Sequence, residues 1–279
     1  MMTAPSIEKL IRNTDQIMMA TATASQRVGV VQLSCPRHTE YMATITRIRT
    51  RDIYSSCPEC LLDEKRRELA KKIAVRERIE QQHLAECLGR AAVPARFAGR
   101  TLATFKASTP DQQRALSIAN EFVANWSTHY KKGSWLVFSG LPGTGKSHLA
   151  IGILQALIPA YVGRYLTCSE LIQTIRSTWR KDSDAGELQV LDNLEAFPLL
   201  VIDEVGVQYG TDSEQNHIFD VLDRRYREMK PTILLTNQNK EGFREYVGDR
   251  VYDRMTECAR WVPFTWDSYR PQARKEIAE

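Results

Sequence analysis

The stretch SGLPGTGKSHLA (139–150) restricts the possible folds of this 279-residue chain more than any other part of the sequence. Gly140–Ser147 fits the pattern G-x-x-x-x-G-K-[ST] at every position, between an expected buried strand (134–140) and an expected helix (146–158). In that setting the glycines let backbone N–H groups close around phosphates, and the helix N-terminus adds its positive dipole. The sequence therefore predicts a nucleotide-binding domain.

The pattern from residue 111 onward predicts the architecture of that domain. The expected strands and helices alternate along the chain: strands at 134–140, 164–168, 198–205, 231–237 and 260–266, and helices at 146–158, 169–180, 213–229 and 243–255. Repeated strand–helix units of this kind predict an α/β fold, in which helices cover both faces of a parallel sheet.

The glycine-rich loop also predicts the nucleotide ligands. Lys146 is expected to reach the β- and γ-phosphates of ATP, and the Ser147 hydroxyl to bind Mg²⁺. The nucleotide-contacting residues are then expected to be Gly140, Leu141, Pro142, Gly143, Thr144, Gly145, Lys146, Ser147 and His148.

A pair of carboxylates and an amide complete the expected reaction site. In PLLVIDEVG a run of apolar residues leads into Asp203, a candidate for the Mg²⁺ shell, and Glu204, a candidate to orient and deprotonate an attacking water. The next strand ends at Asn237, whose amide is expected to hold that water. Phosphoryl transfer alone would not need the second carboxylate, so the pair favours hydrolysis.

Four further residues predict a metal site near the N-terminus. Two pairs, C-x₂-H and C-x₂-C, are separated by 18 residues that include a strand-like segment, YMATITRIRT. The expected ligands are Cys35, His38, Cys57 and Cys60. Because all four positions are protein ligands, the pattern predicts a structural zinc ion that stabilises a module too small to hold a core alone.

Composition limits the class of protein. Hydrophobic residues make up 43% and charged residues 26% of the chain, as is typical of soluble globular proteins. No apolar run approaches the roughly 18 residues that a membrane span needs, and the N-terminus lacks the apolar core of a signal peptide. We therefore expect a cytoplasmic protein with no membrane partner.

The chain is expected to divide into three parts, namely residues 1–60, 61–110 and 111–279. The first holds a short amphipathic helix (6–20) and the zinc module, and the second a charged helix (61–88) and a joint that contains proline and glycine. Residues 61–106 carry 11 Lys/Arg against 6 Asp/Glu. Two interpretations remain open for them: contacts with DNA phosphates, or a solvated helix with ion pairs at helical spacing.

The order of these motifs resembles that of the AAA+ ATPases, and more narrowly that of helicase loaders of the DnaC type. The resemblance covers about residues 90–270 and is carried by FSGLPGTGKSHLA, LLVIDEVGVQ, DRRY, PTILLTNQN, GDRVYDRM and WDSYR. The N-terminal third looks more like the metal-bearing modules of loaders from phages and Gram-positive bacteria.

The resemblance implies further roles. Lys146 and Ser147 would bind MgATP beside the acidic pair, with Asn237 as a sensor. Arg254 would be the finger that reaches the γ-phosphate bound by a neighbouring subunit, although Arg250 on the same helical face remains an alternative, and Arg270 would be a second sensor. Helix 169–180, with the segment to about 194, would line a path for single-stranded DNA.

The function implied is an ATPase that assembles into a ring or spiral and delivers a hexameric DnaB-type replicative helicase onto single-stranded DNA. The alternative is a transposase-helper ATPase of the IstB type, which binds target DNA. A third possibility is a DNA-binding zinc protein whose ATP site is only a switch, but Glu204 and Asn237 argue against it.

Overall fold

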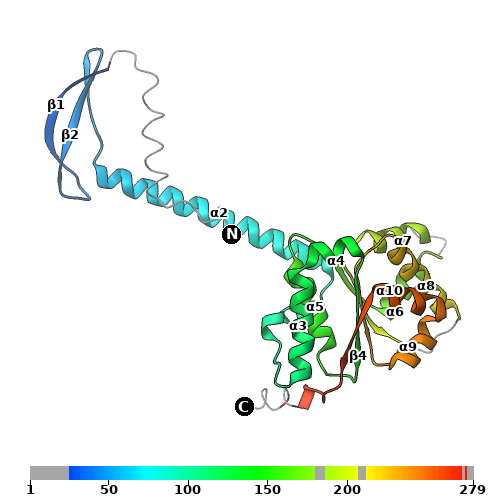
Figure 1. Ribbon diagram of the computed structural model, residues 1–279. Helices are drawn as coiled ribbons and strands as arrows, with labels where there is room; N and C mark the ends of the chain where they lie inside the picture. Colours follow the sequence, from blue (N-terminus) through cyan, green and yellow to red (C-terminus); the bar gives the residue numbers. More distant parts are fainter. Residues whose placement is uncertain (1–24, 180–185, 207–211, 272–273, 275–279) are drawn as a thin grey trace. The chain divides into compact units, whose positions relative to one another are not determined.

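The computed structural model of the protein describes residues 25–179, 186–206, 212–271 and 274. The amphipathic helix expected at 6–20 lies outside the described residues. The chain divides into two compact units, residues 1–79 and 80–279, and the division falls inside the long helix α2 (Pro58–Ala91; Figure 1). None of the helices in the described ranges is long and apolar enough to cross a bilayer.

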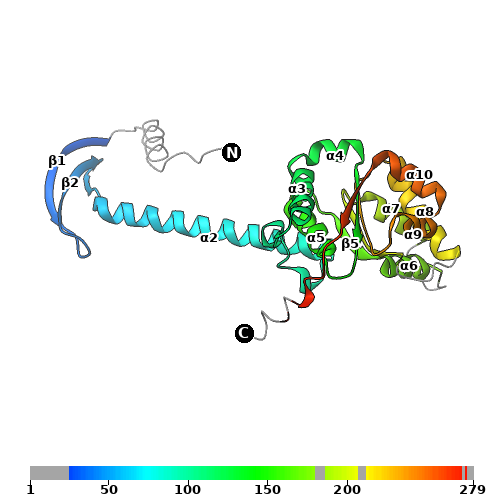
Figure 2. The ribbon, with the colours of Figure 1, turned by 60° about the horizontal axis from the view of Figure 1, so that its bottom comes forward.

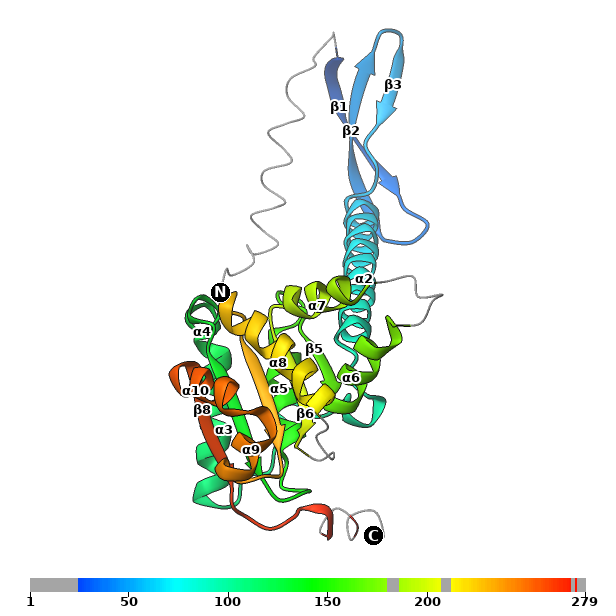
Figure 3. The same cartoon turned by 90° about the vertical axis from the view of Figure 1, so that its right-hand side faces the viewer.

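The first unit contains a three-stranded antiparallel sheet in the order β1-β2-β3 (Figure 3). Its strands are β1 (Ser25–Ser34), β2 (Glu40–Ile48) and β3 (Arg51–Tyr54), of which the sequence predicted only the middle one. Among the described residues up to 79, the buried side chains are those of Cys35, Ala43 and Cys57. Because this unit has almost no apolar core, something other than hydrophobic burial must hold it together.

Helix α2 is three residues longer at each end than the expected 61–88. It begins with Pro58, a residue suited to the first helical position because its missing N–H is not needed there. It ends before Ala92, which adopts a left-handed conformation (φ 51°) shortly before Pro94. Charged and polar residues surround most of the helix, and only Cys87 and Ala91 near its end are buried.

The second unit contains a parallel sheet of five strands in the order β5-β6-β7-β4-β8. Their bounds are β4 Trp135–Gly140, β5 Arg164–Thr167, β6 Leu200–Val205, β7 Thr232–Thr236 and β8 Ala259–Phe264. Each lies within two residues of its prediction. Strands β4, β6 and β7 are buried along most of their length, as expected of a sheet covered on both faces.

Helices cover both faces of this sheet, which confirms the predicted fold class (Figures 1 and 2). One layer comprises α3 (Pro110–Ala124), α4 (Trp126–Lys132) and α5 (Lys146–Leu157). The other comprises α6 (Cys168–Ser177), α7 (Glu187–Ala196), α8 (Asp212–Arg227), α9 (Lys240–Val247) and α10 (Asp249–Cys258). Each layer has its own hydrophobic core against the sheet.

The prediction of a single helix over 243–255 was wrong. Gly248 adopts a left-handed φ of 81° and separates α9 from α10, so the chain turns between two short helices. The backbone N–H of Gly248 donates to the carbonyl of Arg244, while the Gly248 carbonyl accepts from Tyr252. The apolar spacing continues across this glycine, which is why periodicity alone did not reveal the break.

The segment expected to be a joint (90–110) is part of the second unit. It contains two short 3₁₀ turns, η2 (Ala95–Phe97) and η3 (Leu102–Thr104). Phe97, Leu102 and Phe105 lie against the core on the α5 side of the sheet. The Gln155 side chain on α5 donates to the carbonyl of Ala98 at 3.0 Å. This segment therefore forms part of the surroundings of the nucleotide loop.

Candidate active site

The loop between β4 and α5 has the backbone of a phosphate cradle. Gly143 and Gly145 adopt left-handed φ values of 82° and 96°. A Cβ atom at Gly143 would lie 2.1 Å from Oγ of Ser268, so a side chain there would clash as well as strain the backbone. The predicted glycines are thus required by conformation and by space.

Lys146 lies at the start of α5 with its side chain almost fully buried. Its ammonium donates to the carbonyls of Gly140 at 2.6 Å and Leu141 at 2.9 Å, and to Oδ1 of Asn237 at 2.8 Å. The pKa of Lys146 is lowered to about 8, chiefly by burial and also by the positive charge of Arg270, against the opposing effect of Asp203. The ammonium is therefore a desolvated cation whose present partners are neutral oxygens, a state that phosphate would relieve.

The acidic pair lies at an irregularity of the sheet. The pairing of β6 with β7 shifts register between Ile202 and Val205, so the strand bulges at the two carboxylates. Glu204 has a φ of 61° and an exposed side chain, whereas Asp203 is buried. A non-glycine residue held in the left-handed region costs free energy, and such strain accumulates where a side chain must point in a particular direction. The bulge directs Glu204 and Asp203 into different environments.

Asp203 is held at both carboxylate oxygens. The backbone N–H of Glu204 donates to Oδ1 at 2.7 Å. Ser147 Oγ and the Tyr165 hydroxyl both donate to Oδ2, at 2.6 and 2.7 Å. Because the Ser147 proton points to Asp203, the lone pairs of Oγ remain available, and a hydroxyl beside a carboxylate is a hard-oxygen donor set that suits Mg²⁺.

These residues line one cavity of about 1090 Å³, at the upper end of the size range of ligand pockets. The predicted residues on its wall are Pro142, Gly143, Thr144, Gly145, Lys146, Ser147, His148, Asp203, Glu204, Asn237 and Arg270. Gly140 and Leu141 do not line it, and contribute carbonyls to Lys146 instead. The structure thus brings most of the predicted site residues together, including Arg270.

The cavity wall also contains residues that motif analysis missed. They are Pro94, Arg96, Phe97, Arg100, Thr104, Phe105, Lys106 and Gln112 from the segment before and at the start of α3, Tyr165, Thr167 and Glu170 near β5, and Trp266 and Tyr269. The tryptophan and tyrosine belong to the WDSYR motif, so their place beside the loop had a sequence signal. Trp266 Nε1 donates to the carbonyl of Thr144 at 2.8 Å, and the Tyr269 N–H donates to that of Gly143 at 2.9 Å.

His148 connects the nucleotide loop to the segment before α3. Its Nε2 lies 2.9 Å from the carbonyl oxygen of Thr101 and 3.1 Å from Oγ1 of Thr104. The Phe105 ring packs edge-on against the imidazole, with 5.3 Å between the ring centroids. Burial lowers the pKa of His148, which favours the neutral ring. His148 therefore fastens the chain that forms the wall of the cavity.

Arg254 does not line the cavity of its own chain. On α10 it forms an ion pair with Asp223 of α8, and its guanidinium lies 5.9 Å from the ring centroid of Phe219 and 5.7 Å from that of Tyr226. Arg250, one turn earlier, is exposed and forms no ion pair or hydrogen bond within the described ranges. Neither arginine lines the cavity that contains Lys146.

A fully buried arginine anchors α7 to the sheet. The Arg225 guanidinium donates to Oγ1 of Thr232 at 2.9 Å and to the carbonyl of Pro231 at 2.6 Å. It also donates to the carbonyls of Leu194, Glu195 and Phe197 at the end of α7, at 2.8 to 3.1 Å. A cation at a helix C-terminus is stabilised by the helix dipole. The second arginine of the quoted DRRY motif is therefore a structural residue.

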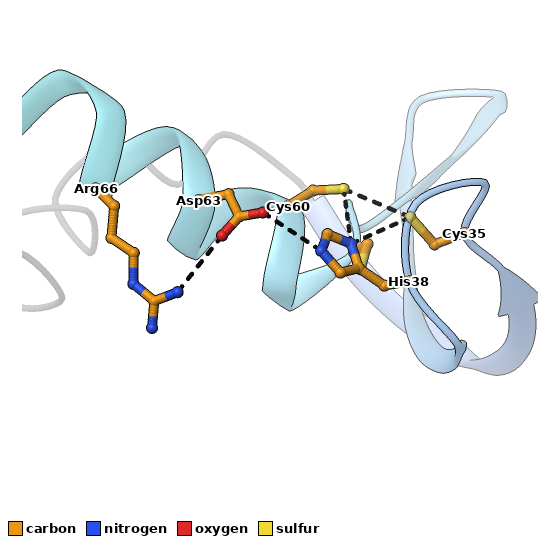
Figure 4. A network of polar contacts seen from close by, with 6 residues as sticks. Cys35, His38, Cys60, Asp63 and Arg66 are labelled. Atoms are coloured by element: carbon orange, nitrogen blue, oxygen red, sulfur yellow. Dashed lines mark hydrogen bonds and ion pairs between the residues drawn. The ribbon is translucent and has the colours of Figure 1, made fainter.

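The four predicted metal ligands of the first unit lie close together, with their ligand atoms within 4.8 Å of one another. Cys35 and His38 lie in the turn between β1 and β2, and Cys60 lies in the first turn of α2 (Figure 4). Cys57 directly precedes that helix. The sulfurs of Cys35 and Cys60 are 3.5 Å apart, close to the roughly 3.8 Å expected between thiolates 2.3 Å from a tetrahedral zinc ion.

His38 presents its two ring nitrogens to different partners. Nδ1 faces the thiols of Cys35, Cys57 and Cys60 at 3.4 to 3.7 Å. Nε2 lies 3.4 Å from Oδ2 of Asp63, which in turn pairs with Arg66 (Figure 4). A carboxylate behind the imidazole is the usual arrangement at histidine–metal sites, because it fixes the ring and its tautomer. The cluster therefore fits a structural metal in its ligands and in their support.

Comparison with known proteins places the second unit in a family. The family model described as IstB-like ATP binding protein matches residues 71–277. The chain belongs to this family. The replicative helicase loader DnaC of Escherichia coli K12 is 37% identical to this chain over 168 residues, which cover 60% of this chain and 67% of DnaC.

DnaC of Buchnera aphidicola subsp. Schizaphis graminum is 31% identical over 191 residues, which cover 67% of this chain and 76% of that one. The crystal structure of the DnaC helicase loader superimposes with a TM-score of 0.56 at 25% identity, covering 61% of this chain and 99% of that chain. These matches confirm the resemblance to DnaC-type AAA+ proteins. This IstB-like protein is thus an AAA+ ATP-binding protein preceded by a small cysteine-rich unit.

Proposed function

We propose that this protein is a cytoplasmic, ATP-hydrolysing loader that delivers a hexameric DnaB-type replicative helicase onto single-stranded DNA during the initiation of replication. The similarity to DnaC, which covers 60% of this chain, carries this proposal. The presence of Glu204 and Asn237 in the cavity beside Lys146 supports an ATPase over a protein that merely binds nucleotide.

In the proposed reaction the residues of the cavity bind ATP and move one proton. Lys146 exchanges its carbonyl partners for the β- and γ-phosphates. Glu204, exposed at the bulge, accepts the proton of a water that attacks the γ-phosphate, and Asn237 holds that water. Ser147 and Asp203 would hold Mg²⁺, which when bound neutralises charge on the phosphate oxygens.

Hydrolysis is proposed to need two subunits. Because Arg254 lies outside the cavity of its own chain, we assign it to the nucleotide of a neighbouring subunit in a ring or spiral. To reach that phosphate it must exchange Asp223 for the new partner, whereas Arg250 has no ion pair to break within the described residues. Arg270, on the wall of the cavity, is proposed to sense the nucleotide from within the same chain.

The remaining elements are proposed to hold the partners. Helices α6 and α7 would line the path of single-stranded DNA, and the Arg225 bonds to the end of α7 would keep that path attached to the sheet. The first unit, held by Zn²⁺ at Cys35, His38, Cys57 and Cys60, would contact the helicase. Its exposed strand residues leave apolar surface for such a contact, among them Val30, Met42, Ile48 and Ile53.

Co-purification tests this function against a transposase-helper ATPase, the alternative that the description of the matching family favours. The tagged protein is incubated with ATP and either a purified DnaB-type helicase or the transposase of an insertion sequence. Retention of the helicase, without retention of the transposase, is the expected result. Retention of the transposase alone would reject the loader.

A further inference from the structure

Tyr165 touches the acidic pair although the nucleotide-binding motifs do not include it. It lies on β5, which pairs with β6 so that Tyr165 is opposite Val201 and Thr167 is opposite Asp203. Side chains alternate along a strand, so Tyr165 and Asp203 share a face of the sheet and are diagonal neighbours. The tyrosine is 5% exposed, and its hydroxyl lies 2.7 Å from Oδ2 of Asp203.

The hydroxyl can act only as a donor in this contact. A carboxylate oxygen only accepts hydrogen bonds, so the phenol O–H is the donor. The acceptor is the same carboxylate oxygen that receives the proton of Ser147. The Asp203 carboxylate is therefore fixed in rotation by two side-chain donors on Oδ2 and by the Glu204 N–H on Oδ1.

We propose that Tyr165 is a positioning residue for the magnesium centre: it orients the Asp203 carboxylate toward the Ser147 hydroxyl. The inference rests on the proposed function of this cavity as a Mg²⁺-dependent ATP site. The terminal torsion of an aspartate is broad, so a carboxylate with a single side-chain donor can rotate away from the metal position. Tyr165 removes that freedom inside a buried site, where a hydrogen bond to a charged group is strong.

The variant Tyr165→Phe removes the hydroxyl and keeps the ring. Changing a group that orients a metal ligand typically costs about 10- to 100-fold in metal affinity or activity. We expect the Mg²⁺ concentration for half-maximal ATP hydrolysis to rise at least about tenfold. Binding of a fluorescent ATP analogue in EDTA should stay unchanged, because Lys146 and the loop glycines bind the phosphates without help from Tyr165.

Tyr246→Phe is the matched control. Tyr246 is a buried tyrosine of the same unit, its hydroxyl contacts Sγ of Cys168 at 3.4 Å, and it does not line the cavity. This variant should show the Mg²⁺ dependence of the unmodified protein. A general loss of packing would affect both variants, whereas the loss of metal positioning affects only Tyr165→Phe.

The outcomes separate this inference from the function on which it rests. If the unmodified protein neither hydrolyses ATP nor binds it more tightly with Mg²⁺, the proposed function fails. If the unmodified protein does both and Tyr165→Phe has the same Mg²⁺ dependence, the positioning role is refuted. Equal weakening of analogue binding with Mg²⁺ and in EDTA would also refute it, because Tyr165 would then act only on the shape of the cavity.

Discussion

Binding of ATP near pH 8 is expected to be coupled to the uptake of a proton by Lys146. In the nucleotide-free protein, burial brings the pKa of this ammonium down to about 8, from its ordinary value of 10.5. Its three hydrogen-bond acceptors are two carbonyl oxygens and an amide oxygen, none of which carries a full charge. The phosphates of ATP bring negative charge and would raise the pKa of Lys146 again.

The size of the effect follows from that pKa. Lys146 holds about 0.9 proton at pH 7, about 0.5 at pH 8 and about 0.1 at pH 9 if it titrates at about 8. If the bound state is fully protonated, binding takes up about 0.1, 0.5 and 0.9 proton at these three pH values. The apparent affinity for ATP should then fall as the pH rises above 8, and approach a tenfold loss per pH unit.

Calorimetric titration in buffers of different ionisation enthalpy measures this uptake directly. ATP itself is fully ionised at pH 8, because the last pKa of a phosphate group is near 6. Arg270→Ala removes a charge that lowers the pKa of Lys146, so the variant should take up less than half a proton at pH 8. Arg260→Ala, on β8 and outside the cavity, is the control and should behave like the unmodified protein. Binding without proton uptake at both pH 8 and pH 9 would refute the account of Lys146.

Three other outcomes are expected. Arg254→Ala should bind ATP but not hydrolyse it, and mixing it with Lys146→Ala should restore ATP hydrolysis at interfaces between the two variants. If that mixture stays inactive and a mixture of Arg250→Ala with Lys146→Ala hydrolyses ATP instead, the finger is Arg250. Arg225→Met should lower the unfolding free energy of the second unit by about 3 kcal/mol or more, because it leaves buried carbonyls without donors; an unchanged denaturation midpoint would argue against the anchor. Cys60→Ser should abolish zinc binding and helicase retention while ATP hydrolysis continues, with all three measured on one preparation. Loss of hydrolysis with the helicase contact intact would contradict the assignment of helicase binding to the first unit and ATP hydrolysis to the second.

The sequence predicted the parallel sheet well because its strands are short apolar runs bounded by motifs. It did not predict β1 and β3. The side chains of β3 are all exposed, and the apolar residues of β1 lie on both of its faces, so neither strand shows the regular apolar–polar alternation in sequence that marks a half-buried strand. The break at Gly248 was missed for a different reason. A glycine within an otherwise continuous helical pattern is compatible with either one helix or two, and only the backbone conformation distinguishes them.

The candidate site was predictable wherever a residue belongs to a motif. Lys146, Asp203 and Asn237 lie in three separate parts of the sequence, yet each belongs to its own local pattern, and the structure brings them to one cavity. Tyr165 and Phe105 have no such pattern. Their places depend on the register of β5 against β6 and on how the segment before α3 packs on the loop, which are properties of tertiary structure.

The central claim is that ATP hydrolysis in this cavity releases the delivered helicase in an active form, and a reconstituted loading reaction tests it most directly. DnaB-type helicase, circular single-stranded DNA and this protein are combined with ATP, and unwinding of an annealed strand is followed. The unmodified protein should load the helicase and allow unwinding. Glu204→Gln should bind ATP, hydrolyse it on the order of 10²-fold more slowly, and leave the helicase on the DNA in an inactive complex. Equal unwinding with both proteins would contradict the claim.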